Sequence, residues 1–207
     1  MKITRIEKQK KRSNRYNIFL DGEFAFGLYD DTILKYGLRT NDELSPDRIN
    51  EMREEDEYTF GKNVAYKFLS YRQRSEKEIR AKLKEKKIQP ATIEKIIKYL
   101  RELKYLDDEL FSKMYLQSQL LNKPAGKRLL KMKMLEKGIS KDTADKILKE
   151  NYNEEDEIKA AKLLLSKYTK RIKKKDEKEI KKKCFQYLIS RGFDFEIAKQ
   201  VIGESDD

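Results

Sequence analysis

One pattern of apolar residues occurs three times beyond residue 60 of this 207-residue chain, over residues 83–97, 134–148 and 188–202. In each stretch, an apolar residue at a predicted helix end is followed by two more at intervals of five. Two adjacent apolar residues then close the stretch. Self-similarity at such a long period is typical of helical repeat proteins, whose units are too small to be stable alone and therefore stack. The pattern predicts three copies of one helical unit.

A tight turn lies in the middle of each copy. Gly138 and Gly192 precede the central apolar residue in two copies, as expected for the left-handed residue that ends many helices, whereas Lys87 occupies this position in the first copy. Each unit is predicted to contain three helices. In the first unit, Ser75 and Glu78 form a capping box, which marks a helix start.

The first forty residues follow a different pattern. Asp21-Gly22 separates the β-rich runs 16–20 and 23–27, which is a strong hairpin signal. Residues 3–9 can add a third strand, with residues 10–14 as its turn. Because a three-stranded sheet is marginal by itself, this segment is expected to pack against another element.

Helices are predicted after the strands. A short helix is expected over residues 30–35, closed near Gly37, and a longer one starts with Ser45 as N-cap and Pro46 in its first position. The predicted fold is therefore mainly α, with three tandem three-helix repeats in an elongated, curved array after a small three-stranded β segment. The predicted divisions are a β-rich extension over 1–45, a linking helix over 46–60, and repeats over 61–107, 108–153 and 154–207.

Composition argues against an enzyme. Charged residues make up 42% of the chain, as expected for amphipathic helices with charged outer faces. The chain has no histidine, which removes the usual general base and most zinc sites. The paired Asp107 and Asp108 are expected to start a helix, with Asp108 as its N-cap, and not to bind a metal. We predict a binding protein that needs no cofactor and no metal.

Cys184 is the single cysteine and is expected to be a buried structural thiol. No stretch approaches the apolar length of a membrane span. No dimerisation element is evident. We expect a cytoplasmic protein that does not bind membranes and is a monomer.

The net charge of +12 points to a polyanionic partner: nucleic acid, an anionic membrane surface or an acidic protein. By segment, residues 1–60 carry −2, residues 61–107 carry +8, residues 108–153 carry +4 and residues 154–207 carry +2. The positive field is therefore predicted on the first two repeats.

The primary candidates for polyanion contact are Arg72, Arg74, Lys127, Arg128 and Lys131. The two arginines lie at a helix–helix corner beside Tyr71, and their forked guanidinium groups suit phosphates and carboxylates. One of them could instead cap a helix or pair with Glu78. The other three share one helical face near a helix start at Gly126, which favours anions, although this face could also be simply solvated.

Secondary basic candidates lie in two segments, the turn of the β segment and the second repeat: Lys10, Lys11, Arg12, Lys123 and Lys133. The basic run 170–175 is expected to be a linker within the third repeat. None of these positions has a pattern that specifies one ligand.

Several of these segments resemble the RecX family. The resemblance rests on YRQRSEKE at 71–78, YLDD at 105–108, GKRL at 126–129 with LEKGI at 135–139, and RGF at 191–193. It covers roughly residues 61–202 in the family's order and spacing. The N-terminal β segment is similar to the extension of RecX proteins from low-GC Gram-positive bacteria. Two departures stand out: Lys87 replaces the common glycine, and Ser112 stands where the family usually has alanine.

The resemblance implies a regulator without catalytic chemistry. RecX proteins bind the RecA recombinase in the groove of its filament on single-stranded DNA, and they restrain ATP hydrolysis, strand exchange and co-protease action. This implies a role in DNA repair, homologous recombination and the SOS response. Some members also bind DNA directly, so the resemblance implies single-stranded DNA as a partner through the filament and leaves direct contact open. An alternative, drawn from the residues alone, is a stand-alone DNA-binding protein that places the helix–turn–helix-like corners of its repeats in a DNA groove.

Overall fold

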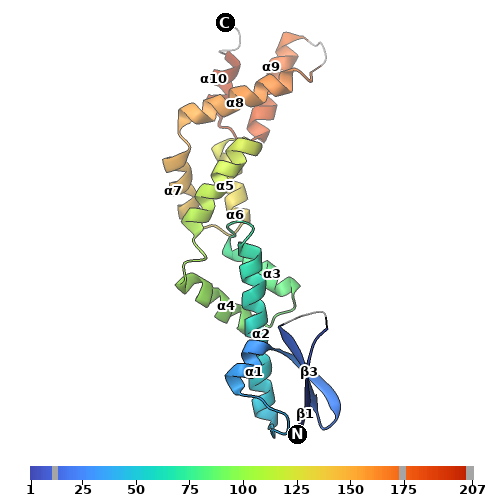
Figure 1. Ribbon diagram of the computed structural model, residues 1–207. Helices are drawn as coiled ribbons and strands as arrows, with labels where there is room; N and C mark the ends of the chain where they lie inside the picture. Colours follow the sequence, from blue (N-terminus) through green and yellow to red (C-terminus); the bar gives the residue numbers. More distant parts are fainter. Residues whose placement is uncertain (11–13, 173–175, 204–207) are drawn as a thin grey trace. The chain divides into compact units, whose positions relative to one another are not determined.

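The computed structural model of the chain describes residues 1–10, 14–172 and 176–203 (Figure 1). These residues form one three-stranded sheet and ten helices. Among them, no helix combines the length and the apolar character that crossing a membrane requires. The predicted class, mainly helical with an N-terminal three-stranded sheet, is confirmed.

The chain packs into two compact units. Unit 1 comprises Met1–Arg72 and Ile79–Tyr105, and unit 2 comprises Gln73–Glu78 and the chain from Leu106 onward. Each unit has its own apolar core, so each is described separately below.

Unit 1 begins with an antiparallel sheet in the order β1-β2-β3. Its strands are β1 (Ile3–Lys8), β2 (Arg15–Leu20) and β3 (Glu23–Tyr29). The hairpin turn between β2 and β3 places Asp21 and Gly22 at φ 49° and 94°. Two successive positive φ angles match the right-handed twist of the flanking strands, and Asp-Gly adopts them readily. The predicted hairpin is confirmed.

Four helices follow the sheet: α1 (Asp30–Tyr36), α2 (Pro46–Leu69), α3 (Glu76–Glu85) and α4 (Pro90–Glu102). Gly37 ends α1 at φ 62°, and the hydroxyl of Ser45 accepts the Arg48 N–H at 3.3 Å, as predicted for both helix ends. Helix α2 is continuous over 24 residues. The segment predicted as a linker and the first helix of the first repeat therefore form one helix.

The sheet packs on α2. Ile18 and Leu28 from the sheet and Met52 from α2 are fully buried in one cluster. A small twisted sheet is marginally stable by itself, so this contact supplies the partner that the sequence required. The β segment and α2 therefore form one folded element.

Unit 2 contains six further helices: α5 (Asp108–Asn122), α6 (Lys127–Glu136), α7 (Lys141–Asn151), α8 (Glu154–Thr169), α9 (Glu177–Ser190) and α10 (Phe195–Gly203). They make two successive sets of three. Asp107, and not Asp108, is the N-cap of α5, since its carboxylate accepts the Leu110 N–H at 2.9 Å. The prediction of Asp108 as N-cap was wrong by one residue because Asp107 has the extended backbone of a cap and Asp108 is already helical.

The three predicted copies share one backbone turn. In each, the N–H of the central apolar residue donates to the carbonyl five residues earlier, at 3.3 Å for Ile88, 3.1 Å for Ile139 and 3.1 Å for Phe193. All three side chains are at most 5% exposed. The residue before them has φ 88° at Gly138 and 84° at Gly192, so the repeat inferred from apolar spacing is confirmed down to the turn.

Lys87 holds φ 58° at this turn, a strained value for a residue with a side chain. We expect Lys87→Gly to raise the free energy of unfolding of unit 1 by roughly 0.5 kcal/mol, because glycine adopts this conformation without the steric cost. Lys98→Gly, on an exposed position inside α4, should instead lower it by about 1 kcal/mol. Urea unfolding of both variants measures the two changes in the free energy of unfolding. If both variants were less stable than the parent chain, Lys87 would not be strained.

Two polar positions noted in the sequence are accommodated inside the helices. Ser112 is fully buried, and its hydroxyl donates to the Asp108 carbonyl of the preceding turn at 2.6 Å. Cys184 is 5% exposed in the core of the third repeat, and burial raises the pKa of its thiol. Cys184 is therefore a structural core residue, as predicted.

Candidate functional site

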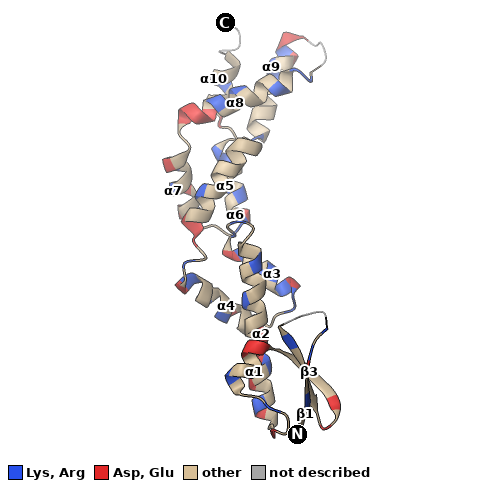
Figure 2. Ribbon diagram, in the orientation of Figure 1, with Lys and Arg blue, Asp and Glu red and all other residues tan. Residues whose placement is uncertain are grey.

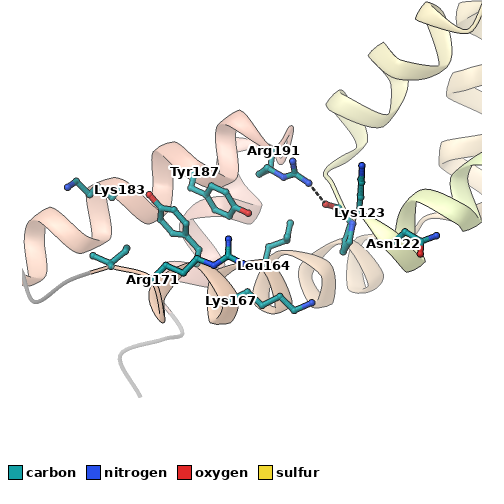
Figure 3. A pocket seen from close by; sticks show the side chains of 11 residues that line it. Asn122, Lys123, Leu164, Lys167, Arg171, Lys183, Tyr187 and Arg191 are labelled. Carbon is teal, nitrogen blue, oxygen red and sulfur yellow. Dashed lines mark hydrogen bonds between the residues drawn. The ribbon is translucent and has the colours of Figure 1, made fainter.

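A basic groove lies in unit 2 between α8, α9 and the segment that joins α5 to α6 (Figure 3). Its volume is about 1140 Å³, and eleven residues line it. Two of them are tyrosines, Tyr168 and Tyr187, and none is acidic. Five are cations: Lys123, Lys167, Arg171, Lys183 and Arg191. We call this surface the basic groove.

Helical periodicity places these side chains on the groove. Lys167 and Tyr168 lie in the last turn of α8. Arg171 follows one turn later, and its backbone N–H donates to the Tyr168 carbonyl at 3.0 Å. On α9 and its C-cap, every fourth residue lines the groove: Lys183, Tyr187 and Arg191. Residues spaced by three or four positions share one face of a helix, so two helices each contribute a basic-aromatic face.

The two tyrosines stack on each other. The ring centroids of Tyr168 and Tyr187 are 4.1 Å apart, and the ring planes differ by 3°. Both rings are half-buried against the core of the third repeat. Within the described part of the chain, neither hydroxyl makes a hydrogen bond, so both are available to a ligand.

Three cations of the groove have no counter-charge among the residues that the structure describes. Several lysines elsewhere in unit 2 pair with carboxylates; Lys146, for example, lies 2.7 Å from Glu109. Lys123, Lys167 and Arg171 make no ion pair and no side-chain hydrogen bond with the described residues. Like charges that converge without a counter-charge produce a local positive potential, which an anionic ligand would relieve.

The other two cations are held in place by neighbours. Arg191 donates from Nη2 to the Pro124 carbonyl at 3.0 Å (dashed in Figure 3), while its Nε is buried without a hydrogen-bond partner. Lys183 pairs with Glu179 one turn earlier on α9, at 3.2 Å and close to solvent. An exposed pair of this kind is weak, so Lys183 can exchange its partner for a ligand.

Lys133 adds to the positive potential around the basic groove. Its ammonium donates to the Gln119 side chain at 3.1 Å. Burial lowers the pKa of Lys133, and repulsion from Arg191 and Lys123 lowers it further. The secondary candidates Lys123 and Lys133 thus belong to one cluster of positive charge with Arg191, which is distant from both in the sequence.

The primary candidates on α6 have partners inside unit 2. Lys127 donates its backbone N–H to Glu157 Oε1 at 2.8 Å, and its ammonium lies 3.3 Å from Glu157 Oε2. Arg128 donates to the Ile189 carbonyl at 2.9 Å. Lys131 pairs with Asp145. Each of these three side chains therefore makes a contact that stabilises unit 2, in addition to any contact with a ligand.

The other candidates are not among the residues that line the basic groove. Arg72 is exposed and Arg74 half-buried at the corner before α3, and both make contacts within the chain. Lys10 is exposed at the end of β1. Lys11 and Arg12 lie outside the described residues.

Comparison with known proteins identifies the family. Models of the RecX N-terminal domain and of the first, second and third RecX three-helix domains match residues 1–45, 62–100, 107–148 and 154–202. The chain belongs to the RecX family. It is 33% identical over 203 residues to Regulatory protein RecX of Clostridium beijerinckii, covering 97% of this chain and 94% of that protein. It is also 33% identical over 205 residues to the protein of the same name from Listeria monocytogenes serovar 1/2a, covering 99% and 76%.

Solved RecX structures have the same fold. A crystal structure of regulatory protein RecX is 28% identical and matches with a TM-score of 0.75, covering 100% of this chain and 99% of that one. RecX from Lactobacillus salivarius is 26% identical and matches with a TM-score of 0.65, covering 73% and 97%.

Two segments that carry the RecX resemblance meet at one junction. Gly126 donates its N–H to the Arg191 carbonyl at 3.0 Å, and Arg128 donates its N–H to the Gly192 carbonyl at 3.2 Å. The first amides of α6 are thereby bonded to the turn that ends α9. A Cβ at Gly126 would overlap the backbone of Gly192 and Phe193, and a Cβ at Gly192 would overlap Leu129, so neither position has room for a side chain. In this RecX chain, the GKRL and RGF segments thus join the second and third repeats.

Most of the basic groove was not predicted from the sequence, since the positive field was expected on the first two repeats. The predicted linker 170–175 does lie between α8 and α9, with residues 173–175 outside the described part of the chain, but its Arg171 lines the groove. The third repeat is nearly neutral overall because acidic residues fill the first turns of α8 and α9 (Figure 2). The usable signal was the helical spacing of Lys167, Tyr168 and Arg171, which places an aromatic between two cations.

Proposed function

We propose that this RecX chain binds the RecA–single-stranded-DNA filament in the cytoplasm, as a monomer, and restrains RecA's ATP hydrolysis, strand exchange and co-protease activity. The basic groove is the observation that carries the proposal, since its unpaired cations suit a polyanionic assembly. Family membership supports a regulatory role. No chemical step by the chain itself is required.

The proposed mechanism is a shift of the filament between its states. A ligand that prefers one conformation of an assembly shifts the assembly toward it, by as much as its affinities for the two states differ. A repeat protein offers an extended surface that can contact several neighbouring protomers. Binding of this kind would hinder the movements between protomers that ATP turnover needs.

The central test is an ATPase titration. We expect that adding the chain to RecA on single-stranded DNA lowers the rate of ATP hydrolysis at ratios near one chain per several RecA protomers. An unchanged rate across the titration would overturn the proposed function.

Charge reversal locates the contact surface. The triple variant Lys123→Glu, Lys167→Glu, Arg171→Glu should raise the concentration for half-inhibition by on the order of tenfold, because three attractive charges become repulsive. The matched control is Lys141→Glu with Lys149→Glu, on exposed positions of α7. Equal losses in both variants would show a general charge effect and not a site.

The candidates from the sequence stay part of the proposed surface and need their own variant. Arg72→Glu with Arg74→Glu tests the corner before α3, and its stability is measured beside inhibition because both arginines make contacts within the chain. Lys127, Arg128 and Lys131 have structural partners, so their substitution changes stability as well as binding. If the Arg72 and Arg74 variant loses inhibition while the groove variant keeps it, the contact lies on the first repeat.

A further inference from the structure

We propose that the basic groove is the site at which this chain contacts single-stranded nucleic acid, with phosphates on Lys123, Lys167 and Arg171 and a base against an outer face of the Tyr168–Tyr187 stack. The inference rests on the proposed function and deepens it, because it names which component of the filament this groove contacts.

The charge of the groove limits its ligand to a polyanion. Five cations and no carboxylate line it, and three of the cations have no partner among the described residues. Phosphates of nucleic acid and carboxylates of an acidic peptide both satisfy such a set. Charge alone therefore does not choose between them.

The tyrosine stack favours nucleic acid. Tyr168 and Tyr187 are stacked face to face among the groove residues, so a base can extend the stack only on the outer face of one of the two rings, near Lys167 and Arg171. Aromatic rings beside backbone-binding cations are the combination that holds single strands without sequence preference, since every base has a face that can stack. An acidic peptide would use the cations and leave the rings without a matching partner.

The position of the rings favours a single strand over a duplex. Both tyrosines are half-buried and lie among groove residues, not on a protruding surface. Bases in a duplex are stacked on each other and expose only their edges in the grooves. Only an unpaired base can be turned out to reach the tyrosines, as in single-strand recognition generally.

Direct binding is measured without RecA, by fluorescence anisotropy of a labelled oligothymidylate of about 20 nucleotides. We expect saturable binding that weakens about tenfold for a threefold rise in salt, as three phosphate contacts imply. An abasic deoxyribose-phosphate oligomer of equal length should bind about tenfold more weakly, because it keeps the phosphates and lacks the bases.

Tyrosine variants separate stacking from structure. Tyr168→Leu and Tyr187→Leu keep apolar bulk in the half-buried core and should weaken oligothymidylate binding about tenfold, with abasic-oligomer affinity unchanged. A merely structural role would lower both affinities together. Tyr168→Phe and Tyr187→Phe should retain binding. Tyr36→Leu, at a half-buried tyrosine of unit 1, is the matched control and should change neither affinity.

Competitors distinguish the ligand classes. Poly-glutamate, duplex DNA or free ATP that displaced the oligothymidylate at equal charge concentration would overturn the assignment to single strands. So would equal affinity for the abasic oligomer. Loss of filament inhibition in the Lys123, Lys167, Arg171 triple variant without any filament-free DNA binding would leave the proposed function standing and assign the groove to an acidic protein surface. Absence of inhibition by the unaltered chain is a separate failure, of the proposed function itself.

Discussion

Replacing Gly126 by alanine is expected to lower the free energy of unfolding of unit 2 by about 3 kcal/mol or more. A Cβ at this position would overlap the carbonyl of Gly192 and the amide of Phe193. Both obstacles are backbone, which cannot rotate away as a side chain can. Relief would require breaking the Gly126 N–H bond to Arg191 and the Arg128 N–H bond to Gly192, so the junction between the second and third repeats would open.

Urea unfolding followed by far-ultraviolet circular dichroism measures this change, and hydrogen exchange should localise it to α6 and α9. Gly203→Ala is the matched control, because a Cβ there meets no atom within 4 Å. Its stability should differ from that of the parent chain by less than about 0.5 kcal/mol. If Gly126→Ala were equally silent, the close approach of the two glycines would be refuted.

Replacing Asp56 by alanine should lower the free energy of unfolding of unit 1 by about 3 kcal/mol. Asp56 is 7% exposed on α2, where it accepts the backbone N–H of Tyr29 and lies 2.9 Å from Arg15. Burial raises the pKa of Asp56 although Arg15 and the Tyr29 N–H lower it. The free-energy cost of desolvating the carboxylate is therefore larger than the stabilisation that these two partners give to its charged form. Removing Asp56 leaves the guanidinium, only 16% exposed, without its counter-charge.

The raised pKa also sets a pH dependence. The folded state holds the Asp56 proton more tightly than the unfolded chain, so this group's contribution to stability decreases as the pH rises from the ordinary aspartate pKa through the raised one. Asp56→Asn should remove that slope from the pH profile of urea midpoints. A slope retained in full would contradict the assignment to Asp56.

Two variants control for this interpretation. Glu54→Ala, on an exposed position of the same helix, should change the free energy of unfolding by less than about 0.5 kcal/mol. Arg15→Met combined with Asp56→Leu should recover part of the loss, since apolar side chains can replace a buried pair but not a single unpaired charge. A double variant no more stable than Asp56→Ala would show that the lost Tyr29 hydrogen bond dominates.

The candidate site was less predictable than the fold, and the reason is physical. The sequence shows that Lys127, Arg128 and Lys131 share a helical face, but not that each meets a partner from another element. Those partners are Glu157, the Ile189 carbonyl and Asp145, which lie 30, 61 and 14 residues away. Whether a cation is available to a ligand depends on such distant contacts, which no local pattern reports.

Local sequence patterns were enough to predict the helical class, the three repeats and the N-terminal hairpin. These features follow from local rules: the spacing of apolar residues on a helix, the left-handed turns at Gly138 and Gly192, and the Asp21-Gly22 turn. Such rules depend only on residues that are close together in the sequence, so they can be applied without knowledge of the tertiary structure.

The position of the uncompensated charge, in contrast, depends on how the helices pack in the folded chain. The fold brings Lys123 together with Lys167, Arg171 and Arg191 around stacked tyrosines from α8 and α9, whereas Lys127 and Lys131 on α6 are paired with carboxylates. It also turns Gly126 and Gly192 into a contact between repeats. Whether a cation is paired, and whether a glycine is closely packed, depends on contacts between segments that are distant in the sequence. These contacts form only when the repeats stack.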